Sequence, residues 1–121
     1  MKGVRLIENL KFNEKGLIPA IAQDTDTGAV LMLAYMNEEA LRRTLSSGEA
    51  WFYSRSRQKL WHKGETSGNI IKVVSVWKDC DSDTILVRAH PTGPICHTGN
   101  KTCFFQQLTE KDIEAGNQEE G

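Results

Sequence analysis

Short apolar stretches separated by turn-forming residues run along this chain, and they predict mostly strands. Residues 17–24 indicate one strand and residues 29–35 a second, with the turn sequence Asp24-Thr25-Asp26-Thr27-Gly28 between them. These two segments together predict a hairpin. The later stretches with strand character cover residues 50–54, 70–77, 84–89 and 103–108.

One segment has the period and the flanking residues of a helix. Asn37 is a typical N-cap, two glutamates follow it in the first turn, and Gly48 is a typical C-terminal stop. Apolar residues between these ends recur on one face, so we predict a helix over residues 38–47. Thr109 can cap a second short helix, from Thr109 to Ala115.

Few helices and many short strands indicate the fold class α+β: a small β-rich single domain. We place the domain at residues 1–108 and a polar, acidic C-terminal tail at residues 109–121. A chain of 121 residues buries a modest core, so dimerisation or metal binding would stabilise it.

The charge balance and the apolar runs exclude several classes of protein. With 15 basic and 16 acidic residues the net charge is −1, which argues against a strongly basic nucleic-acid-binding domain. The longest apolar run, residues 29–36, is far shorter than the about 20 residues that span a bilayer, and residues 1–12 lack a signal-peptide pattern. We therefore expect a cytoplasmic protein that binds neither membrane nor nucleic acid. Its three cysteines do not suit a secreted disulfide framework.

Three carboxylates alternate in the run Asp79-Cys80-Asp81-Ser82-Asp83. Like charges this close repel one another unless a cation neutralises them, and a hard divalent cation prefers such oxygen ligands. In a straight strand Asp79 and Asp83 would lie about 13 Å apart, so they converge on one ion only if the chain turns here. An EF-hand loop is disfavoured, because Thr84 replaces its glycine and His90 its glutamate. A metal site and a solvated polar turn both remain open at this point.

The thiols of Cys80, Cys96 and Cys103 suggest a second metal. Three soft ligands without a fourth match a catalytic zinc site, in which one coordination position stays open. The separation of Cys96 and Cys103 does not fit the CxxC knuckle of a structural zinc finger. In an extended chain Cys80 points away from its neighbouring carboxylates, so one segment can serve two metal sites. Three unrelated cysteines are the alternative.

Two polar stretches carry further functional groups. In Gly93-Pro94-Ile95-Cys96-His97-Thr98-Gly99, His97 lies beside a cysteine and is a candidate general acid or base, with an exposed histidine of no special role as the alternative. Residues 55–69 hold cationic groups that suit phosphate oxygens, an indole that can stack on a base, and glycines that allow close approach of the backbone. A solvated loop is the alternative for this second stretch.

Taken together, these stretches resemble the phosphoribosyl-AMP cyclohydrolase family of histidine biosynthesis. The resemblance covers about residues 17 to 105, and its motifs occur in family order and at family spacing. Thr102 stands where the family usually has serine, so a hydroxyl is retained, whereas Ile71 stands where glutamine is common. The matching stretches are Leu31-Met32-Leu33-Ala34-Tyr35-Met36-Asn37, Phe52-Tyr53-Ser54-Arg55-Ser56-Arg57, Leu60-Trp61-His62-Lys63-Gly64-Glu65-Thr66-Ser67-Gly68-Asn69, Asp79-Cys80-Asp81-Ser82-Asp83, Gly93-Pro94-Ile95-Cys96-His97-Thr98-Gly99 and Cys103-Phe104.

The resemblance implies a hydrolase that opens the adenine ring of 1-(5-phosphoribosyl)-AMP, the third step of L-histidine biosynthesis. It also implies an intertwined homodimer that uses Zn²⁺ and Mg²⁺, and we expect cyclohydrolase activity alone, without the pyrophosphohydrolase domain of many relatives. Carried over by position, the magnesium ligands would be Asp79, Asp81 and Asp83, and the zinc ligands, drawn from both subunits, Cys80, Cys96 and Cys103. His97 would be the acid/base group, and the substrate contacts would come from Arg55, Arg57, Trp61, Lys63, Glu65 and Ser67.

Two other functions fit the sequence less well. A zinc nucleobase deaminase needs an H-x-E and a P-C-x-x-C motif, whereas here two residues separate His62 from Glu65 and no cysteine follows Cys96 at that spacing. A zinc-stabilised module that binds single-stranded RNA without catalysis would use the aromatic run 51–53 and the basic stretch that follows it. The near-neutral charge and the open zinc position argue against that module.

Overall fold

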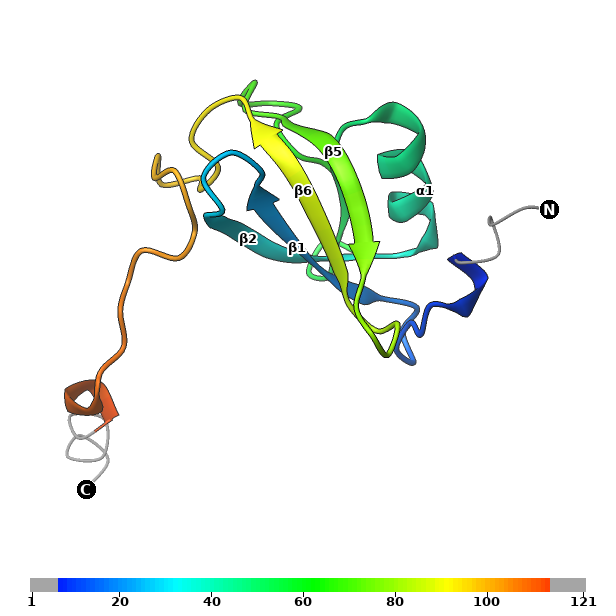
Figure 1. The fold of residues 1–121 in the computed structure, drawn as a ribbon, viewed down its shortest axis with the longest axis horizontal. Coiled ribbons are helices and arrows are strands. Elements are labelled where there is room, and N and C mark those ends of the chain that lie inside the picture. Colours follow the sequence, from blue (N-terminus) through cyan, green and yellow to red (C-terminus); the bar gives the residue numbers. More distant parts are fainter. Residues whose placement is uncertain (1–6, 114–121) are drawn as a thin grey trace.

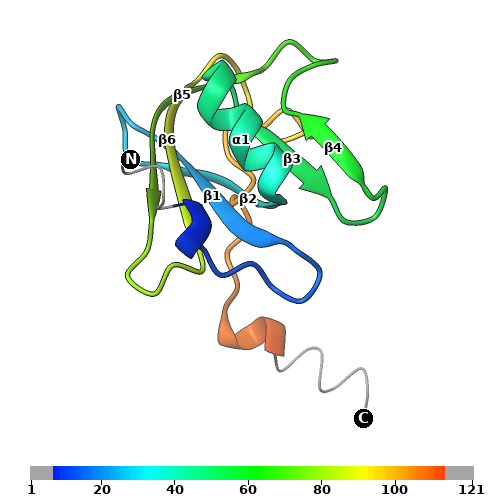
Figure 2. The same ribbon diagram turned by 90° about the vertical axis from the view of Figure 1, so that its right-hand side faces the viewer.

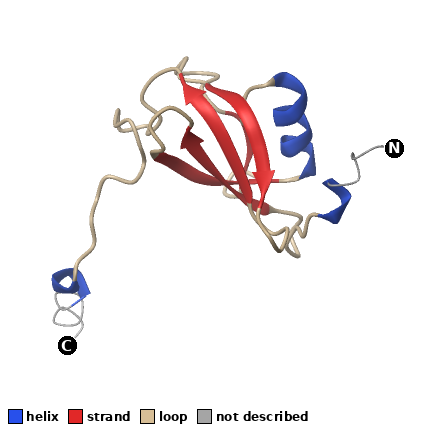
Figure 3. Cartoon of the chain, in the orientation of Figure 1, coloured by secondary structure: helices blue, strands red, loops and turns tan. Residues whose placement is uncertain are grey.

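The computed structural model describes residues 7–113, and this part of the chain forms one mixed sheet with a helix on one face (Figures 1 and 3). The sheet order is β4-β3-β2-β1-β6-β5, in which β1 and β6 run parallel and all other neighbours antiparallel. The elements are β1 (Ile18–Asp24), β2 (Val30–Met36), α1 (Glu38–Ser47), β3 (Trp51–Ser54), β4 (Lys59–His62), β5 (Ile71–Lys78) and β6 (Ile85–Pro91). The β-rich α+β class and the 24–28 hairpin turn are therefore confirmed.

Strand β1 lies near the centre of the sheet, and its side chains alternate between a covered and an open face. Ile18, Ala20 and Ala22 are fully buried, whereas the residues between them are half-buried. The buried residues belong to one core with Ala40 and Leu41 of α1. Figure 2 looks onto α1 and shows it in front of the sheet. The helix therefore covers one face only, and burial of that face is the main source of stability.

Helix α1 begins and ends where its caps predict. The Asn37 side chain accepts a hydrogen bond of 2.8 Å from the Ala40 N–H, and Gly48 closes the helix in the left-handed conformation. Inside the helix, the Thr44 hydroxyl donates to the Ala40 carbonyl at 2.8 Å and accepts from the Trp51 N–H at 2.9 Å. This one buried hydroxyl joins the helix to the start of β3.

Two predictions for the remaining segments need correction. The polar stretch 55–69 contains strand β4, whose side chains alternate between exposed and half-buried. Residues 103–108 do not form a strand: the Cys103 N–H donates to the Leu31 carbonyl at 2.8 Å, but the segment after it leaves the sheet with exposed side chains (Figure 1). Apolar composition alone does not make a strand, and after Cys103 this segment pairs with no strand of the described chain.

The capping prediction at Thr109 is confirmed, because its hydroxyl accepts a hydrogen bond of 3.2 Å from the Lys111 N–H at the start of a helical turn over residues 110–113. The end of that predicted helix, at Ala115, lies outside the described residues. Between residues 7 and 113, no helix is long and apolar enough to cross a membrane.

We predict that Gly64 is the glycine least tolerant of substitution in the 55–69 stretch. Its φ is +87°, and a Cβ built there would lie 2.4 Å from the Ile70 backbone nitrogen. Gly64→Ala should lower the free energy of unfolding by about 3 kcal/mol or more. Gly68 has a similar φ of +84° with nothing within 4 Å of a Cβ, so Gly68→Ala is the matched control and should cost only about 1 kcal/mol. Urea unfolding of both variants measures the difference, and equal losses would contradict the prediction.

Candidate functional site

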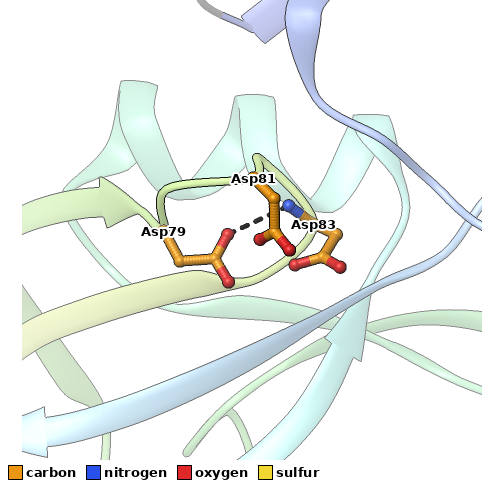
Figure 4. Close-up of side chains that lie close together, drawn as sticks. All are labelled: Asp79, Asp81 and Asp83. Carbon is orange, nitrogen blue, oxygen red and sulfur yellow. Dashed lines mark hydrogen bonds between the residues drawn. The ribbon is translucent and has the colours of Figure 1, made fainter.

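The turn that joins β5 to β6 gathers the three predicted magnesium ligands (Figure 4). Asp79 begins the turn, and its carboxylate accepts hydrogen bonds from the backbone N–H groups of Asp83 at 3.0 Å and Thr84 at 3.2 Å. Ser82 adopts a left-handed φ of 64°, which bends the chain back. The carboxylate oxygens of Asp79, Asp81 and Asp83 consequently lie within 4.8 Å of one another, all exposed. The sequence indicated that the three carboxylates could converge only if the chain turned at this point, and the chain does turn here.

Close approach of these carboxylates changes their acidity. Partial burial opposes ionisation of Asp79, but the hydrogen bonds that it accepts from Asp83, Asp81 and Thr84 outweigh this effect and lower its pKa. The Asp81 side chain, partial burial and Asp79 together raise the pKa of Asp83. As the pH falls, Asp83 therefore takes up a proton before Asp79 does. We expect any cation bound by these carboxylates to be held more weakly as the pH falls.

The thiols of Cys96 and Cys103 lie close together at the other end of β6. Cys96 is buried, and its sulfur accepts a hydrogen bond of 3.0 Å from the Thr98 hydroxyl. This bond, with smaller contributions from Cys103 and Lys63, lowers the pKa of Cys96. Partial burial and the neighbouring Cys96 sulfur raise the pKa of Cys103. As the pH rises, Cys96 therefore loses its proton before Cys103 does. A thiol must lose its proton before it can bind a metal.

The third thiol does not join this pair within one chain. Cys80 is exposed in the turn before β6, whereas Cys96 lies in the loop after β6. The seven residues of β6 separate these two loops (Figure 1), and a strand of that length spans about 20 Å. The three cysteines therefore cannot bind one ion unless a second copy of the chain supplies one of them.

A cleft of about 730 Å³ gathers the six residues that we predicted to contact the substrate. It lies along β2, β3 and β4 and the loop that follows β4. Four cationic side chains line it, and the exposed face of Trp61 provides an aromatic surface. The six predicted residues are Arg55, Arg57, Trp61, Lys63, Glu65 and Ser67.

Lys63 connects this cleft to the thiol pair. Its ammonium donates a hydrogen bond of 2.6 Å to the Ile95 carbonyl, directly before Cys96, and lies 5.6 Å from the centre of the Trp61 ring. Its charge contributes to a lower pKa at both Cys96 and Cys103. An ammonium has three protons to donate, so one can hold the thiol loop while others face an anion in the cleft.

Tyr35, Tyr53 and Lys59 line the cleft but were not among our predicted site residues. Tyr35 and Tyr53 are cross-strand partners on β2 and β3, and the Arg55 guanidinium lies 4.2 Å from the centre of the Tyr35 ring. Lys59 supplies the fourth cation of the cleft. Both tyrosines lie within the matching motifs, but only the strand register shows that they are neighbours.

The three histidines of the chain have different surroundings. His62 also lines the cleft, but its Nε2 lies 2.7 Å from a Glu49 carboxylate oxygen and its ring stacks on Trp51 with centroids 4.5 Å apart. His90 lies 3.1 Å from the Asp26 carboxylate. His97 is exposed beside the buried Cys96.

The aromatic run at residues 51–53 does not form a platform for stacking RNA bases. Phe52 is fully buried in the core, and Trp51 is already stacked on His62. An RNA-binding surface of the kind we considered needs several open aromatic faces side by side. The cleft instead presents cationic and polar groups around Trp61.

A comparison with known protein families decides between these interpretations. The model of phosphoribosyl-AMP cyclohydrolase matches residues 32–105, more than half of the chain. The chain belongs to the phosphoribosyl-AMP cyclohydrolase family. The matched range contains the carboxylate turn, all three cysteines and the whole cleft.

Two phosphoribosyl-AMP cyclohydrolases are similar to this chain over most of their length, and a longer bifunctional protein is similar over about half of its length. The enzyme of Pelotomaculum thermopropionicum is 58% identical over 106 residues, which cover 88% of this chain and 81% of the relative. The enzyme of Listeria innocua is 58% identical over 96 residues, which cover 79% of this chain and 91% of the relative. The histidine biosynthesis bifunctional protein HisIE of Caldanaerobacter subterraneus is 59% identical over 105 residues, and this chain covers 51% of that longer protein.

We predict that the Thr98 hydroxyl controls the ionisation of Cys96 in this cyclohydrolase. Thr98→Val removes the donor that stabilises the thiolate, so the pKa of Cys96 should rise toward that of an ordinary thiol. Titration of the thiolate ultraviolet absorbance in metal-free protein measures this shift. Thr66→Val, in the loop after β4, is the control and should leave the titration unchanged. An unchanged pKa in Thr98→Val would contradict the assignment.

Proposed function

We propose that this chain is a metal-dependent phosphoribosyl-AMP cyclohydrolase. It adds water to the adenine ring carbon that bears the amino group and breaks the bond to the adjacent ribosylated nitrogen. The product is the phosphoribosyl-formimino-aminoimidazole carboxamide ribotide of L-histidine biosynthesis. The observation that carries the proposal is the single cleft that gathers all six residues expected from the family motifs.

The cleft suits a substrate with two phosphates and a purine. Arg55, Arg57, Lys59 and Lys63 supply positive charge, and guanidinium groups bind phosphate oxygens in pairs. The partly exposed indole of Trp61 can stack on the purine. The volume of about 730 Å³ falls in the range of ordinary ligand sites.

Magnesium fits the turn between β5 and β6. Three carboxylates whose oxygens lie within 4.8 Å of one another need only a small contraction to share one hard cation. Such an ion usually retains several waters, which leaves positions for phosphate oxygens. We therefore assign Asp79, Asp81 and Asp83 as its ligands.

Zinc fits the thiols only if two copies of the chain combine. Cys96 and Cys103 are adjacent and differ in acidity, while Cys80 lies at the opposite end of β6. We therefore propose a homodimer in which Cys80 of one copy joins the thiol pair of the other. Zinc, when bound, supplies a Lewis acid that favours ionisation of water near neutral pH.

His97 is our candidate for the proton transfers. Its ring is exposed next to Cys96, where a water attacking the substrate would lose a proton. An imidazole can take that proton and return it to the departing ring nitrogen. Because the three thiols are free, we also propose a reducing, cytoplasmic location.

The reaction can be tested directly. Purified protein given phosphoribosyl-AMP should produce the ultraviolet change of ring opening, and a zinc-selective chelator should abolish it while circular dichroism shows an intact fold. Restored zinc should restore turnover. A folded, zinc-loaded sample without turnover would contradict the proposed function.

Sharing of thiols between subunits has its own test. Cys80→Ser and Cys96→Ser should each be inactive alone. When the two variants are co-expressed, half of the dimers are mixed and each mixed dimer keeps one intact site, so about a quarter of wild-type activity should return. A Cys96→Ser and Cys103→Ser pair is the control and should recover nothing, because both losses affect the same half-site. A site built within one chain would leave both mixtures inactive.

A further inference from the structure

The guanidinium of Arg55 presents an unpaired charge to the cleft. It lies over the ring of Tyr35, with its central carbon 4.2 Å from the ring centre. In the described part of the chain, none of its N–H groups has a hydrogen-bond acceptor or an ion-pair partner. By contrast, Arg42 and Arg43 of α1 are each paired with a glutamate one turn earlier, at 2.6 and 2.9 Å. The five N–H donors of Arg55 are therefore available to an anion.

The backbone on both sides of this ring contact is held in place. Tyr35 is half-buried in β2, which is paired with β1 on one side and with β3 on the other. Arg55 directly follows the last residue of β3, and a hydrogen bond of 2.8 Å from the Gln58 N–H to the Ser54 carbonyl closes the turn that it opens. The ring is therefore a fixed support, and a guanidinium that already rests on it loses little side-chain freedom when a ligand binds.

The cationic residues of the cleft form two groups at opposite ends of β4. Lys59 begins β4 and pairs with Ser54, directly before Arg55, so these two cations share one end, which we call the remote end. Lys63 follows the last residue of β4 and holds the thiol loop, so we call its end the thiol end. Four residues of extended chain separate Lys59 from Lys63, which is about 13 Å. The cleft therefore has two positive ends.

The substrate of the proposed function has two phosphates with a matching arrangement. One sugar phosphate is attached to the ring nitrogen beside the carbon that is attacked. The other is attached to a nitrogen of the five-membered ring, on the far side of the purine. Because we place the attacking water beside Cys96, the attacked carbon and the sugar next to it lie toward Lys63. The sugar phosphate of the five-membered ring then extends toward the remote end.

We propose that Tyr35 is a positioning residue, whose ring holds Arg55 at the remote end to bind the phosphate on the sugar of the five-membered ring. This inference rests on the proposed function and assigns one of the two substrate phosphates to a particular side chain. A guanidinium whose face lies on an aromatic ring retains the N–H groups at its edge, and these can bind two phosphate oxygens at once.

Calorimetric titration with AMP tests the phosphate assignment, because AMP carries the phosphate of the five-membered-ring sugar and lacks the other sugar phosphate. Arg55→Ala should weaken AMP binding by at least about 10-fold, since it removes charge-assisted hydrogen bonds. Adenosine has no phosphate and should not distinguish Arg55→Ala from the wild type. Lys63→Met should weaken AMP binding less than Arg55→Ala does. A larger effect of Lys63→Met would place this phosphate at the thiol end and overturn the assignment.

Variants of Tyr35 test whether the ring acts through Arg55. Tyr35→Leu removes the ring and should weaken AMP binding by about 5-fold, whereas Tyr35→Phe retains the ring face and should restore wild-type affinity. In a protein that already carries Arg55→Ala, Tyr35→Leu should have no further effect. If the ring only supported the sheet, Tyr35→Leu would weaken binding by the same factor in both backgrounds, and the positioning role would be overturned.

Arg55→Lys tests the ring contact even if Tyr35→Leu does not fold, because residue 55 is exposed. It retains the charge but loses the planar fork, so AMP should bind at least about 5-fold more weakly. Wild-type affinity in Arg55→Lys would overturn the role of the ring. Arg43→Ala is the matched control. Arg43 lies 4.9 Å from the centre of the Trp51 ring, but it is paired with Glu39 and lies outside the cleft, so AMP binding should not change.

The outcomes separate this inference from the proposed function. A wild-type protein that does not bind millimolar AMP, or unchanged binding in Arg55→Ala, would overturn the assignment even if ring opening is observed. An equal loss in Arg43→Ala would show that AMP responds to the total charge of the protein, and would overturn it as well. The expected losses of AMP binding without any ring opening would support the assignment and contradict the proposed reaction.

Discussion

The parallel pairing of β1 with β6 is the constraint on which the rest of the structure depends. It brings a strand from late in the sequence to the centre of the sheet, beside the first hairpin. The residues that we predicted as metal ligands then lie near the two ends of β6, in the carboxylate turn before it and the thiol loop after it. The same pairing buries the alternate residues of both strands in one core, so each loop begins or ends on a strand that is anchored in the core.

Hydrogen bonds within the loops then tune the individual groups. The backbone N–H groups of the β5–β6 turn hold Asp79 ionised while its neighbours raise the pKa of Asp83. The Thr98 hydroxyl favours the thiolate of Cys96, and the Thr102 hydroxyl donates to the Val30 carbonyl at 2.6 Å, which fixes the chain just before Cys103. Asp79 and Cys96 are therefore held by neighbours close in sequence, whereas the chain at Cys103 is held by contacts with β2.

Local signals predicted the local structure well. The caps Asn37 and Gly48 fixed the helix, the 24–28 turn fixed the first hairpin, and short motifs were sufficient to collect the cleft residues. Features that depend on distant pairing could not be predicted. The parallel register of β1 and β6 determines which residues share the uncovered face, and no local pattern encodes it. The same limit explains the incorrect strand at 103–108, whose exposed apolar residues pair with no strand of the described chain.

The hydrogen bond between the Lys63 ammonium and the Ile95 carbonyl has a thermodynamic consequence. It makes one side chain a common element of the anionic cleft and of the thiol loop. Whatever draws this ammonium toward an anion alters the loop beside Cys96, and whatever fixes the loop alters the charge presented to the anion. Linkage requires the two effects to be equal in free energy. Any effect of an anion in the cleft on the loop beside Cys96 would therefore be matched by an equal effect of that loop on anion binding.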